Sequence, residues 1–496
     1  MNYKRNLILV VAYNAEKTIG SVIDRINKTL CNSDADILVL DDCSQDKTVE
    51  IAEKKSLELL NSNIIVLRNP VNQGYGGNQK IGYQYAIERG YQNVAMVHGD
   101  GQYAPEELLR LLEPLLNREA EVVFGSRMIS KKSALAGGMP IYKWIGNQVL
   151  SNIQNVLLGS NLSEFHSGYR LYSVEALKKI PFERNSNDFH FDTDIIIQVL
   201  LAKCRIVELS IPTFYGDEKC YVNGFKYARD VLLSTFKSKL HSWNLFYDRK
   251  YDIGQIEFNY DLKLGFISSH SMAIECARPG SNILDIGCGQ GLVAKELFKK
   301  GAHVVGVDQY AGNSGDSQIR VLQSDLDNGL PEIDISHFDQ IYMLDIIEHL
   351  KDPEAFMENL RQTSRGKRPE LVITTANVAF IIIRLMLLLG SFNYGKKGIL
   401  DRTHTRLFTF DSLLRLLTES GYSITECRGI PPPYPKAIGL NILSKALLWI
   451  NTILIGIFPK LFSYQIFVKA KFNPTVDILL NEALNSKINL SGKNNK

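Results

Sequence analysis

The first half of the chain alternates short apolar runs with longer stretches in which apolar residues recur at helical spacing. Five runs have the length and composition of buried strands: Asn6–Val11, Ile37–Leu40, Ile64–Leu67, Asn93–Val97 and Glu121–Phe124. Strands that alternate with helices in this way are typical of a mostly parallel sheet with helices on both faces. The pattern therefore predicts an α/β fold for the first half.

The loop His98–Tyr103 follows the fourth run and precedes a predicted helix with Pro105 near its start. This order places Asp100 at the carboxyl end of a strand, where ligands bind in open α/β sheets. Asp100 and Gln102 offer oxygen ligands of the kind that Mg²⁺ or Mn²⁺ prefers, and such an ion would neutralise a diphosphate leaving group. A simple turn of glycine and aspartate is the alternative that these residues leave open.

Two further loops carry groups that suit a nucleotide. Asp41 and Asp42 end the second run, where a second carboxylate suits contacts to a base and a ribose. The alternative is a turn in which Ser44 or Asp46 caps the next helix. Loop 72–80 follows the third run with three glycines before a helix, which allows close backbone approach to a ligand and favours phosphate.

A second strand, loop and helix pattern begins at Ser281. The stretch 281–286 predicts a strand, glycines follow at 287, 289 and 291, and 292–300 has helical spacing. Gly301–Asp308 then predicts another strand that ends in a carboxylate, which suits a ribose diol. The spacing GxGxG, in place of GxGxxG, favours S-adenosylmethionine over a nicotinamide dinucleotide.

The composition limits the class of protein. With 496 residues the chain is too long for one core, which predicts two or three domains. Hydrophobic content of 45%, charged content of 22% and a net charge of +3 indicate a folded protein without a general affinity for nucleic acid. The 7 cysteines are scattered without CxxC pairs, which indicates reduced thiols in a cytoplasmic compartment.

No segment predicts a membrane span. Leu7–Ala12 is soon followed by polar residues, so we expect a buried strand and not a signal peptide. Phe380–Leu389 and Ala446–Phe458 are apolar, but Arg384 and Asn451 interrupt them, and neither reaches the roughly 18 residues that a span needs. Each of the two segments is expected to cover a substrate site or to lie in an interface.

The segment Gly224–Lys250 mixes basic and aromatic residues with only two aspartates. Such a segment suits the surface of an anionic bilayer, with the rings at headgroup level. Packing between domains is an equally good interpretation. Nucleic acid is disfavoured.

Seven segments of the first half resemble, in one order, the family 2 glycosyltransferases of the dolichol-phosphate mannosyltransferase type. The segments are VAYNAEKTIG, DDCSQDKT, NQGYGGNQKIGYQYAIERGY, HGDGQYAPEEL, GSR at Gly125–Arg127, HSGYRLYSVEAL at His166–Leu177 and FDTDIIIQVLLAKCRIVELSIPTFYGDE at Phe191–Glu218. The resemblance covers about Asn6 to Tyr227. It implies a GT-A fold, a nucleotide-sugar donor, a divalent metal ion and an inverting displacement.

The resemblance also implies roles for individual residues. By position, Asp42 would hold the nucleotide with Ala12, Tyr13 and Glu16 around it, and Asp100 and Gln102 would hold Mg²⁺ or Mn²⁺. The family often has Asp where this chain has His98. An imidazole can ligate Mn²⁺, but we favour a hydrogen-bonded residue at the edge of the site.

Arg127 and Arg170 look like the family's anion-binding arginines, and a bidentate guanidinium suits a phosphate. Asp192 and Asp194 precede a predicted helix, where capping is their default role. We take Asp194 as the candidate base for an acceptor hydroxyl. A polyprenyl phosphate acceptor would need no base, because its oxygen is already anionic.

The second half resembles class I S-adenosylmethionine-dependent methyltransferases from about Leu262 to Phe472. The segments that carry this resemblance are LDIGCGQGLVAKELFKKGAHVVGVD, SDLDNGLP and DQIYMLDIIEHLKDPEAFMENL. By position, the resemblance implies that the methionine end of the cofactor is lined by Asp285, Gly287, Gly289 and Gly291. It also implies that Asp308 binds the ribose and that Asp325 and Leu326 flank the adenine. Asp345 would lie near the methyl group.

Methyl transfer depends mainly on positioning, helped by a base if the acceptor is a hydroxyl. His349 and His404 are the candidate bases, although a His at His349's position is more often structural. His404 is preferred, because it stands beside Asp401 and Arg402 in a segment that resembles substrate loops of tandem glycosyltransferase–methyltransferase proteins.

We therefore expect two α/β domains, a GT-A nucleotide-sugar-binding fold and a Rossmann-like methyltransferase fold. The expected bounds are 1–240 for the first, 241–264 for a basic and aromatic linker, 265–474 for the second and 475–496 for a polar tail. The expected function is sugar transfer to a lipid phosphate or lipid-linked acceptor, with methylation of a related glycan or intermediate, in the cytoplasm or at the cytoplasmic face of a membrane. Extension of a soluble or cell-surface polysaccharide is one alternative, and a scaffold with one half that only binds its ligand is another.

Overall fold

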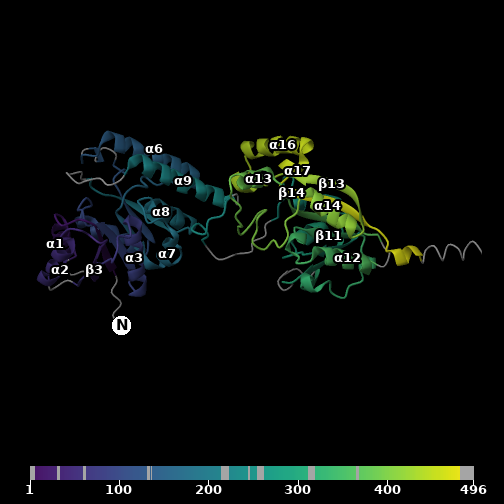
Figure 1. Ribbon diagram of the computed structural model, residues 1–496, viewed down its shortest axis with the longest axis horizontal. Helices are drawn as coiled ribbons and strands as arrows, with labels where there is room; N and C mark the ends of the chain where they lie inside the picture. The colour runs from purple at the N-terminus through teal and green to yellow at the C-terminus, as the bar shows by residue number, and fades with distance from the viewer. Residues whose placement is uncertain are drawn as a thin grey trace, which may run out of the picture. The chain divides into compact units, whose positions relative to one another are not determined.

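The computed structural model divides into two compact units, Met1–Ile256 and Glu257–Lys496 (Figure 1). The boundary falls inside the predicted linker, and the expected domain bounds remain predictions. The structure describes residues 6–30, 34–59, 63–130, 134–135, 137–213, 223–243, 246–253, 262–310, 319–364 and 368–480. The end of the predicted glycosyltransferase motif at 214–218, and most of the predicted polar tail, lie outside these ranges.

The first unit is built on a seven-stranded mixed sheet. Its strands are β1 (Asn6–Ala12), β2 (Ala35–Asp41), β3 (Ile64–Arg68), β4 (Asn93–His98), β5 (Val122–Ser126), β6 (Arg170–Ser173) and β7 (Ile206–Ser210). Their order is β3-β2-β1-β4-β6-β5-β7. Strand β6 runs antiparallel to both of its neighbours, and the other pairs are parallel. The predicted α/β fold is confirmed.

Helices cover both faces of this sheet. They are α1 (Ile19–Thr29), α2 (Thr48–Glu58), α3 (Tyr75–Glu88), α4 (Leu108–Leu116), α6 (Ile141–Leu158), α7 (Val174–Lys178), α8 (Phe191–Leu201) and α9 (Gly224–Ser242). Successive side chains of a strand point to opposite faces. Accordingly, Ile8 and Val10 of β1 pack in a core with α1 and α4, while Leu7 and Leu9 pack in a second core with α3, α7 and α8.

Part of the basic and aromatic segment belongs to the packing of the first unit. Helix α9 contacts α6 and α8, and it buries Val231, Thr235 and Ser238. After α9, Tyr251 is buried and Lys250 forms an ion pair with α8. Packing therefore explains this part of the segment, while Phe225 at the start of α9 is exposed.

The second unit is built on another seven-stranded sheet. Its strands are β8 (Asn282–Ile286), β9 (His303–Asp308), β10 (Arg320–Gln323), β11 (Gln340–Leu344), β12 (Glu370–Ala376), β13 (Tyr422–Ile430) and β14 (Gln465–Phe472). The order is β10-β9-β8-β11-β12-β14-β13, with β14 antiparallel to β12 and β13. This arrangement is the predicted Rossmann-like methyltransferase fold.

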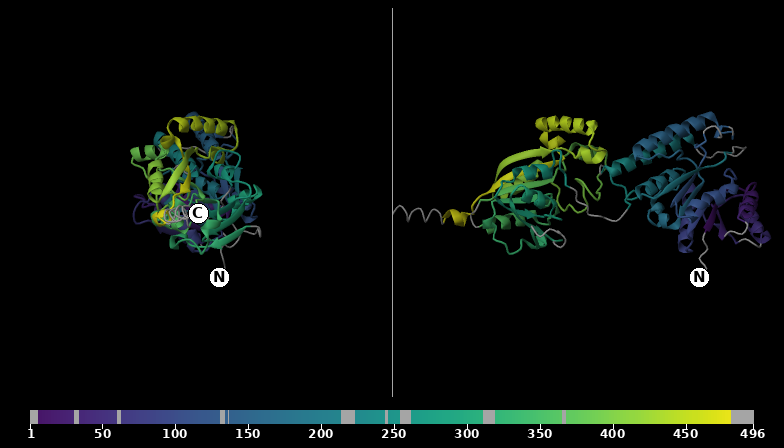
Figure 2. Two further views of the ribbon diagram at one scale, coloured as in Figure 1. Left: turned by 90° about the vertical axis from the view of Figure 1, so that its right-hand side faces the viewer. Right: turned by 180° about the vertical axis from the view of Figure 1, so that it is seen from behind.

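The helices of the second unit are α10 (Ser269–Cys276), α11 (Leu292–Lys299), α12 (Pro353–Thr363), α13 (Ile381–Leu388), α14 (Phe410–Glu419), α15 (Tyr434–Ile438), α16 (Ile442–Ile457) and α17 (Pro459–Phe462). Helices α12 and α14 pack in one core, and α10 and α11 pack in another on the opposite face. Figure 2 shows the unit from two further sides. Among the described residues, we find no helix that is long and apolar enough to cross a membrane.

Candidate active sites

The carboxyl ends of β2, β1 and β4 meet at one edge of the first sheet. These strands are parallel neighbours, with Ala12 opposite Asp41 and Val11 opposite His98. The last residue of β1 and the loops that follow the three strands hold the predicted nucleotide and metal residues Ala12, Tyr13, Glu16, Asp42, Asp100 and Gln102. The fold therefore brings these six residues to one edge, where α/β sheets bind ligands.

The loops after β1 and β2 are hydrogen-bonded to each other. Three amides of the first loop donate to side chains of the second: Asn14 N to Ser44 Oγ (2.8 Å), Ala15 N to Thr48 Oγ1 (2.8 Å) and Glu16 N to Asp46 Oδ2 (3.1 Å). Asn14 adopts a left-handed backbone conformation with φ 49°. Tyr13 beside it remains 45% exposed, so its ring is available to a ligand.

Asp42 is buried and holds the loop that leads into α3. Its Oδ1 accepts hydrogen bonds from Gln73 N at 2.8 Å and Asn69 Nδ2 at 2.9 Å, and its Oδ2 accepts from Gly74 N at 3.0 Å. The carboxylate thus anchors the glycine-containing loop to the end of β2. Its predicted contact with a nucleotide remains a prediction.

The glycines of this loop are explained by contact with the chain itself. A Cβ at Gly74 would lie 2.7 Å from Asn187 O, and one at Gly76 would lie 2.5 Å from Ser186 O. The amide of Gly76 also donates to Asn187 O at 2.8 Å. The glycines therefore allow the start of α3 to pack against 186–191, and the expected contact with a phosphate remains a prediction.

Asp100 stands at the end of β4 with a carboxylate that is 43% exposed. Its Oδ1 accepts a hydrogen bond from Gln102 N at 3.0 Å, so the turn holds the two residues together. Thr18 Oγ1 donates to Gly99 O at 2.7 Å and ties this turn to the start of α1. An exposed carboxylate beside an amide side chain fits a divalent cation.

His98 begins a polar chain that leads away from this edge into the protein. Its Nε2 lies 3.3 Å from the Tyr75 hydroxyl, which donates to Asp192 Oδ2 at 2.9 Å. Asp192 Oδ2 in turn lies 3.7 Å from the guanidinium of Arg170. These contacts match the hydrogen-bonded role that we favoured for His98. A Cβ at Gly168 would lie 2.5 Å from His98 Nε2, which explains that glycine.

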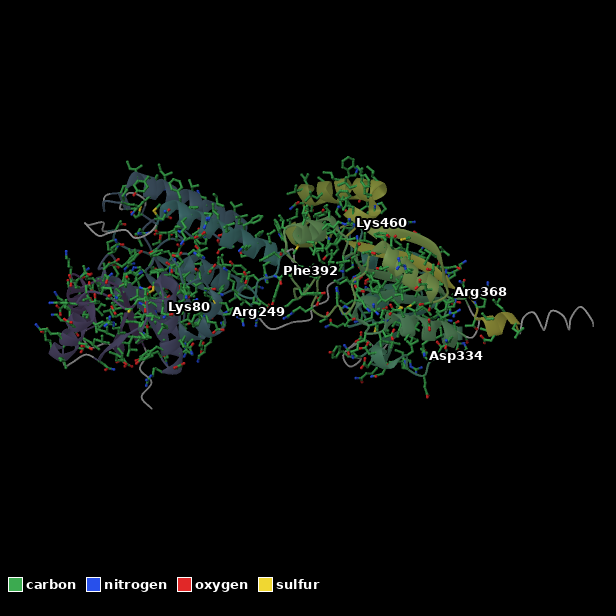
Figure 3. All side chains as sticks on the ribbon, in the orientation of Figure 1. Lys80, Arg249, Asp334, Arg368, Phe392 and Lys460 are labelled. Carbon is green, nitrogen blue, oxygen red and sulfur yellow. The ribbon has the colours of Figure 1, made fainter. Side chains whose placement is uncertain are left out.

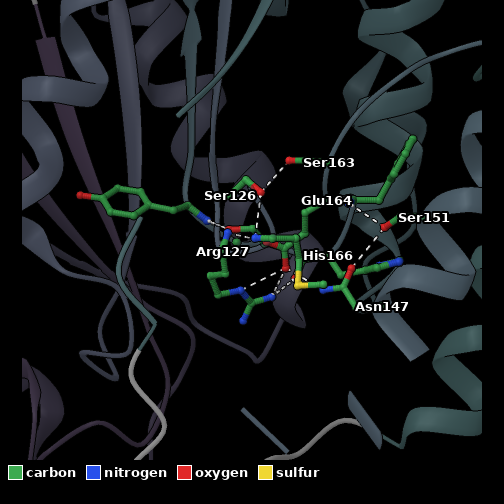
Figure 4. A network of polar contacts seen from close by, with 12 residues as sticks. Ser126, Arg127, Asn147, Ser151, Ser163, Glu164 and His166 are labelled. Carbon is green, nitrogen blue, oxygen red and sulfur yellow. Dashed lines mark hydrogen bonds and ion pairs between the residues drawn. The ribbon is translucent and has the colours of Figure 1, made fainter. Parts of the chain in front are cut away.

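Arg127 is held at the end of β5 by Glu164 (Figure 4). Its Nε donates to Glu164 Oε1 at 3.0 Å, its amide donates to Oε2 at 2.7 Å, and its Nη2 donates to His166 O at 3.0 Å. Asn147 of α6 adds a hydrogen bond to Oε1 at 2.7 Å. Burial disfavours the charge of Glu164, but the Arg127 guanidinium and these hydrogen bonds outweigh it and lower the pKa of the carboxyl.

In the second unit, Asp308 holds the glycine loop after β8. Its Oδ2 accepts from Gly289 N at 2.8 Å. A Cβ at Gly287 would lie 2.6 Å from Ile346, so packing requires glycine there. Gly289 and Gly291 have φ of 55° and 72°, and no described heavy atom lies within 4 Å of a Cβ built on either. The loop therefore leaves space above its backbone.

Asp285 lies below this loop at the end of β8. It is buried, and its Oδ2 has no hydrogen-bond partner among the described residues. Burial and then the charge of Asp308 raise the pKa of Asp285 to about 7. A buried acceptor without a donor, next to an open glycine loop, fits a ligand that brings an ammonium or another donor.

Asp345 is fixed by three parts of the second unit. It has φ 53°, and its Oδ1 accepts from Thr374 Oγ1 at 2.7 Å and Gln465 Nε2 at 2.8 Å. Its Oδ2 lies 3.5 Å from Lys263 Nζ. Burial opposes its charge, but Lys263 and the Thr374 hydrogen bond lower the pKa of Asp345 overall.

His349 and His404 form a ring pair with centroids 4.8 Å apart. His349 Nδ1 lies 3.1 Å from Thr403 O, and His404 Nδ1 lies 2.9 Å from Ile399 O. A carbonyl can only accept, so each Nδ1 carries the proton and each neutral ring has Nε2 as an acceptor. Burial and the neighbouring His349 lower the pKa of His404.

Two families match this sequence. The profile of Glycosyl transferase family 2 matches residues 7–181, and that of a methyltransferase domain matches 267–426. The chain is 30% identical to undecaprenyl-phosphate mannosyltransferase of Micrococcus luteus over 42% of this chain and 82% of that protein. The chain belongs to glycosyl transferase family 2. This family 2 glycosyltransferase carries a methyltransferase domain in its second unit, and the protein is a transferase enzyme with both kinds of domain.

Two further relatives represent the two halves. UDP-N-acetylglucosamine–dolichyl-phosphate N-acetylglucosaminyltransferase of Methanococcus voltae is 30% identical over 42% of this chain and 86% of its own length. Ubiquinone biosynthesis O-methyltransferase of Hahella chejuensis is 27% identical over 24% of this chain and 50% of its own length. The chain therefore spans about half the length of that methyltransferase relative.

In this family 2 glycosyltransferase, Asp194 does not join the other predicted residues. It is fully buried, its Oδ1 accepts from Lys250 Nζ at 2.8 Å, and its Oδ2 accepts from Ser186 N at 3.1 Å. Residues two apart on a helix point about 200° apart. Asp192 consequently faces the His98 chain, while Asp194 faces the segment after α9. These contacts favour a structural role for Asp194, and its role as a base remains a prediction.

Arg170 is buried among backbone carbonyls. Its Nε donates to Ser167 O at 2.7 Å, its Nη1 to Asp192 O at 2.8 Å and its Nη2 to Phe165 O at 2.8 Å. These contacts make Arg170 a positioning residue for loop 165–168 and the start of α8. Its expected contact with a phosphate remains a prediction.

The two predicted adenine residues of the methyltransferase domain lie in different surroundings. Asp325 is exposed and accepts hydrogen bonds from Asp327 N at 3.1 Å and Asn328 Nδ2 at 3.0 Å. Leu326 is buried in the core with Leu284. Its side chain therefore points into the core, and its expected place beside an adenine remains a prediction.

Glu348 is a residue of this second domain that the sequence analysis did not select. It is buried, its Oε2 has no hydrogen-bond partner among the described residues, and burial together with the charge of Asp345 raises its pKa to about 8. Its carbonyl accepts from Thr405 N at 2.9 Å and so holds the His404 loop. The dipeptide Glu348-His349 after an apolar strand was the available signal.

In the first domain, Glu164 and Tyr75 were missed because their partners lie far away in sequence.

Proposed function

We propose that the chain is a bifunctional enzyme. Its first domain transfers a sugar from a nucleotide-sugar donor to a polyprenyl phosphate, and its second domain methylates a related glycan or lipid-linked intermediate with S-adenosylmethionine. The observation that carries the proposal is the edge where β2, β1 and β4 gather Asp42 and Asp100, in a chain that is 30% identical to an undecaprenyl-phosphate mannosyltransferase over most of that relative's length.

In the first domain, Asp100 and Gln102 would hold Mg²⁺ or Mn²⁺. When bound, the ion supplies positive charge that neutralises the diphosphate leaving group. The loop Ala12–Glu16 faces the nucleotide, with Asp42 keeping the neighbouring loop in place. Arg127, oriented by Glu164, presents its charge toward the acceptor phosphate. The acceptor oxygen is already anionic, so the displacement needs no base from this chain.

In the second domain, Asp308 would bind the ribose hydroxyls and Asp285 the amino group of S-adenosylmethionine. When bound, this cofactor supplies a methyl group on a sulfonium. Gly289 and Gly291 leave room for it above the loop backbone. Asp345, held by Thr374 and Gln465, would lie near the methyl group. His404, with Nδ1 bound to Ile399 O, would accept the proton of an acceptor hydroxyl at Nε2.

The test for the first domain is transfer of labelled sugar from UDP- and GDP-sugars to undecaprenyl phosphate in detergent with Mn²⁺. The full chain is expected to form a labelled lipid, and Asp100→Ala is expected to lose turnover at least a hundredfold while it still binds uridine or guanosine diphosphate. Asp24→Ala, an exposed carboxylate of α1, is the matched control. Absence of transfer by the unaltered chain with any donor and lipid phosphate would overturn the lipid acceptor.

The same assay separates the alternative functions. Transfer to a soluble or cell-surface polysaccharide, and not to a lipid, would favour the polysaccharide enzyme. Nucleotide binding without turnover by the unaltered chain would favour the scaffold. For the second domain, methyl label from S-adenosylmethionine is expected in the lipid-linked glycan fraction of cells that contain the protein, at the cytoplasmic face of the membrane. Label in no fraction would count against that activity.

A further inference from the structure

Helix α16 of the methyltransferase domain is apolar on its outer side as well as on its inner side. The two residues that it buries are Ser444 and Asn451, seven positions apart on one side. Its inner side also holds the half-buried residues Leu447, Leu448, Leu454 and Ile455. On its outer side, Ile442 is 89% exposed and Trp449 is 68% exposed. A helix of a water-soluble surface normally buries its apolar stripe. Exposed large apolar residues together with buried polar ones therefore mark an interaction surface.

The apolar surface extends over most of α16 and continues on α13. The exposed large apolar residues of the two helices and their flanks are Leu385, Leu387, Leu388, Leu389, Phe392, Leu440, Ile442, Leu443, Trp449, Ile450, Ile453, Ile457 and Phe458. We call these residues the outer apolar surface. Both helices lie on the same side of the second unit in every view (Figures 1 and 2), and the side chains of α16 project away from the unit (Figure 3).

The two helices are fixed to the domain by their inner sides. Phe380, just before α13, packs edge-on against Tyr464 at the start of β14, with ring centroids 5.8 Å apart. Asn377 Nδ2 donates to Ser463 O at 2.8 Å, just after α17. A Cβ at Gly429 of β13 would lie 2.9 Å from Ile455 of α16, so this helix rests closely on the sheet edge. The outer apolar surface is therefore carried on a folded scaffold.

The two stretches of chain that carry the surface have only basic charged residues. Three of these pair with acids outside the stretches: Lys460 with Asp411, and Arg428 and Lys469 with Glu426. The sequence has no Asp or Glu from Cys427 to Val476, and none from Leu371 to Leu400. The same two stretches contain nine lysines and arginines, which are Arg384, Lys396, Lys397, Arg428, Lys436, Lys445, Lys460, Lys469 and Lys471. Lys445 is exposed on α16 itself. Basic residues beside an apolar helix with a Trp suit an anionic lipid surface, where the Trp ring lies at headgroup level.

We infer that the outer apolar surface inserts α16 and α13 into the headgroup layer of an anionic bilayer. The methyltransferase domain thereby binds a membrane through its own surface. Neither helix can span a bilayer, but an interfacial helix needs only one apolar side. The inference goes beyond the proposed function, because it holds whether or not the sugar acceptor is a lipid phosphate. A second copy of the chain and a protein partner are the other possible occupants, and they are distinguished by the experiment.

The test uses Trp449 as a local probe in the full-length chain. The chain has three tryptophans, and Trp144 and Trp243 lie in the first unit. In the Trp144→Phe/Trp243→Phe variant, the emission of Trp449 is expected to be red without lipid. It is expected to shift to the blue with vesicles of phosphatidylcholine and phosphatidylglycerol in equal parts, and to be quenched by brominated acyl chains. Vesicles of phosphatidylcholine alone are expected to bind at least about tenfold more weakly.

Variants of the outer apolar surface measure how much its residues contribute to vesicle binding. Ile450→Gln/Ile453→Gln is expected to weaken the affinity for the anionic vesicles about a hundredfold, roughly tenfold for each side chain. Lys445→Gln is expected to weaken it about fivefold. Val476→Gln/Leu479→Gln removes two exposed apolar residues of the same unit outside the surface and is expected to change nothing. All variants are exposed positions, and circular dichroism checks that each is folded.

Three results would overturn the inference. The first is Trp449 emission that is already blue without lipid, since another part of the chain or a second copy would then cover α16. The second is vesicle binding by the full chain without quenching of Trp449, which would place the contact elsewhere. The third is equal binding to neutral and anionic vesicles, which would remove the role of the basic residues. Loss of sugar transfer has no bearing on any of them.

Discussion

The buried ion pair between Asp194 and Lys250 allows a quantitative test of a structural role for Asp194. The Asp194 side chain is fully buried, and the Lys250 side chain is 14% exposed. Lys250→Met would leave the carboxylate with the hydrogen bonds from Ser186 N and Tyr251 but without its counter-charge. Removal of one partner of a buried pair typically costs about 3 to 5 kcal/mol. We therefore expect Lys250→Met to lower the free energy of unfolding of the first unit by this amount.

The assay is urea unfolding followed by tryptophan fluorescence in a Trp449→Phe background. Both remaining tryptophans lie in the first unit, so the signal reports that unit and avoids a mixed transition from two domains. In thermal unfolding, the same loss would lower the midpoint by roughly 6 to 20 °C for a domain of this size.

Two further variants make the result specific. Asp194→Asn/Lys250→Met removes both charges and is expected to recover most of the lost stability, because no buried charge is left unpaired. Lys237→Met, at an exposed lysine of α9, is expected to stay within about 0.5 kcal/mol of the unaltered chain. A Lys250→Met variant that loses less than about 1 kcal/mol would refute a structural role for Asp194 and return it to the candidates for catalysis.

Three more predictions concern the methyltransferase domain. Because the pKa of Asp285 is raised from 3.8 to about 7, the free energy of unfolding is expected to be highest below pH 4 and to fall by at most about 4 kcal/mol as the pH rises to 7. Asp285→Asn should flatten this part of the stability profile in urea titrations from pH 4 to 8. An unchanged profile would contradict the raised pKa of Asp285. Gly287→Ala should destabilise the domain by more than 2 kcal/mol, because its Cβ would clash with Ile346. Gly291→Ala, in open space, should cost only about 1 kcal/mol of backbone strain. Equal losses in parallel unfolding curves would show that the clash at Gly287 is relieved. His404→Gln should lower the methyl-transfer rate about 10² to 10⁴-fold and remove the acidic limb of the pH profile of that rate. The affinity for S-adenosylmethionine, measured by calorimetry, should be unchanged. A rate within threefold of the unaltered chain would exclude His404 as the base.

The strands of both sheets were predictable where apolar residues dominate. Leu7 and Leu9 alternate with Ile8 and Val10 on two buried faces of β1, so the whole run is apolar. Strand β6 was not predicted, because it has four residues and begins with the buried Arg170. Its charge is accommodated by backbone carbonyls from 165–192, which local sequence does not reveal.

The candidate sites were predictable to the level of the loop and less often to the level of the atom. Strand ends and sheet order were enough to bring Asp42 and Asp100 to one edge. The choice between Asp192 and Asp194 depends on helix phase and on Lys250, which is 56 residues from Asp194. Likewise, the glycines of loop 72–80 are explained by contacts with 186–191, on the far side of β6 in sequence.

Strand β14 has a consequence for how the protein is synthesised. It is inserted between β12 and β13, although its residues 465–472 follow both of them in the chain. While the ribosome is still translating this region, β12 has an open edge and β13 has no neighbour to pair with. The second sheet can close only after residue 472 has left the exit tunnel, whereas every strand of the first sheet is by then complete. Nascent chains that stall before this point should depend on chaperones, and a premature stop before 465 should yield a folded first unit attached to an aggregation-prone remainder.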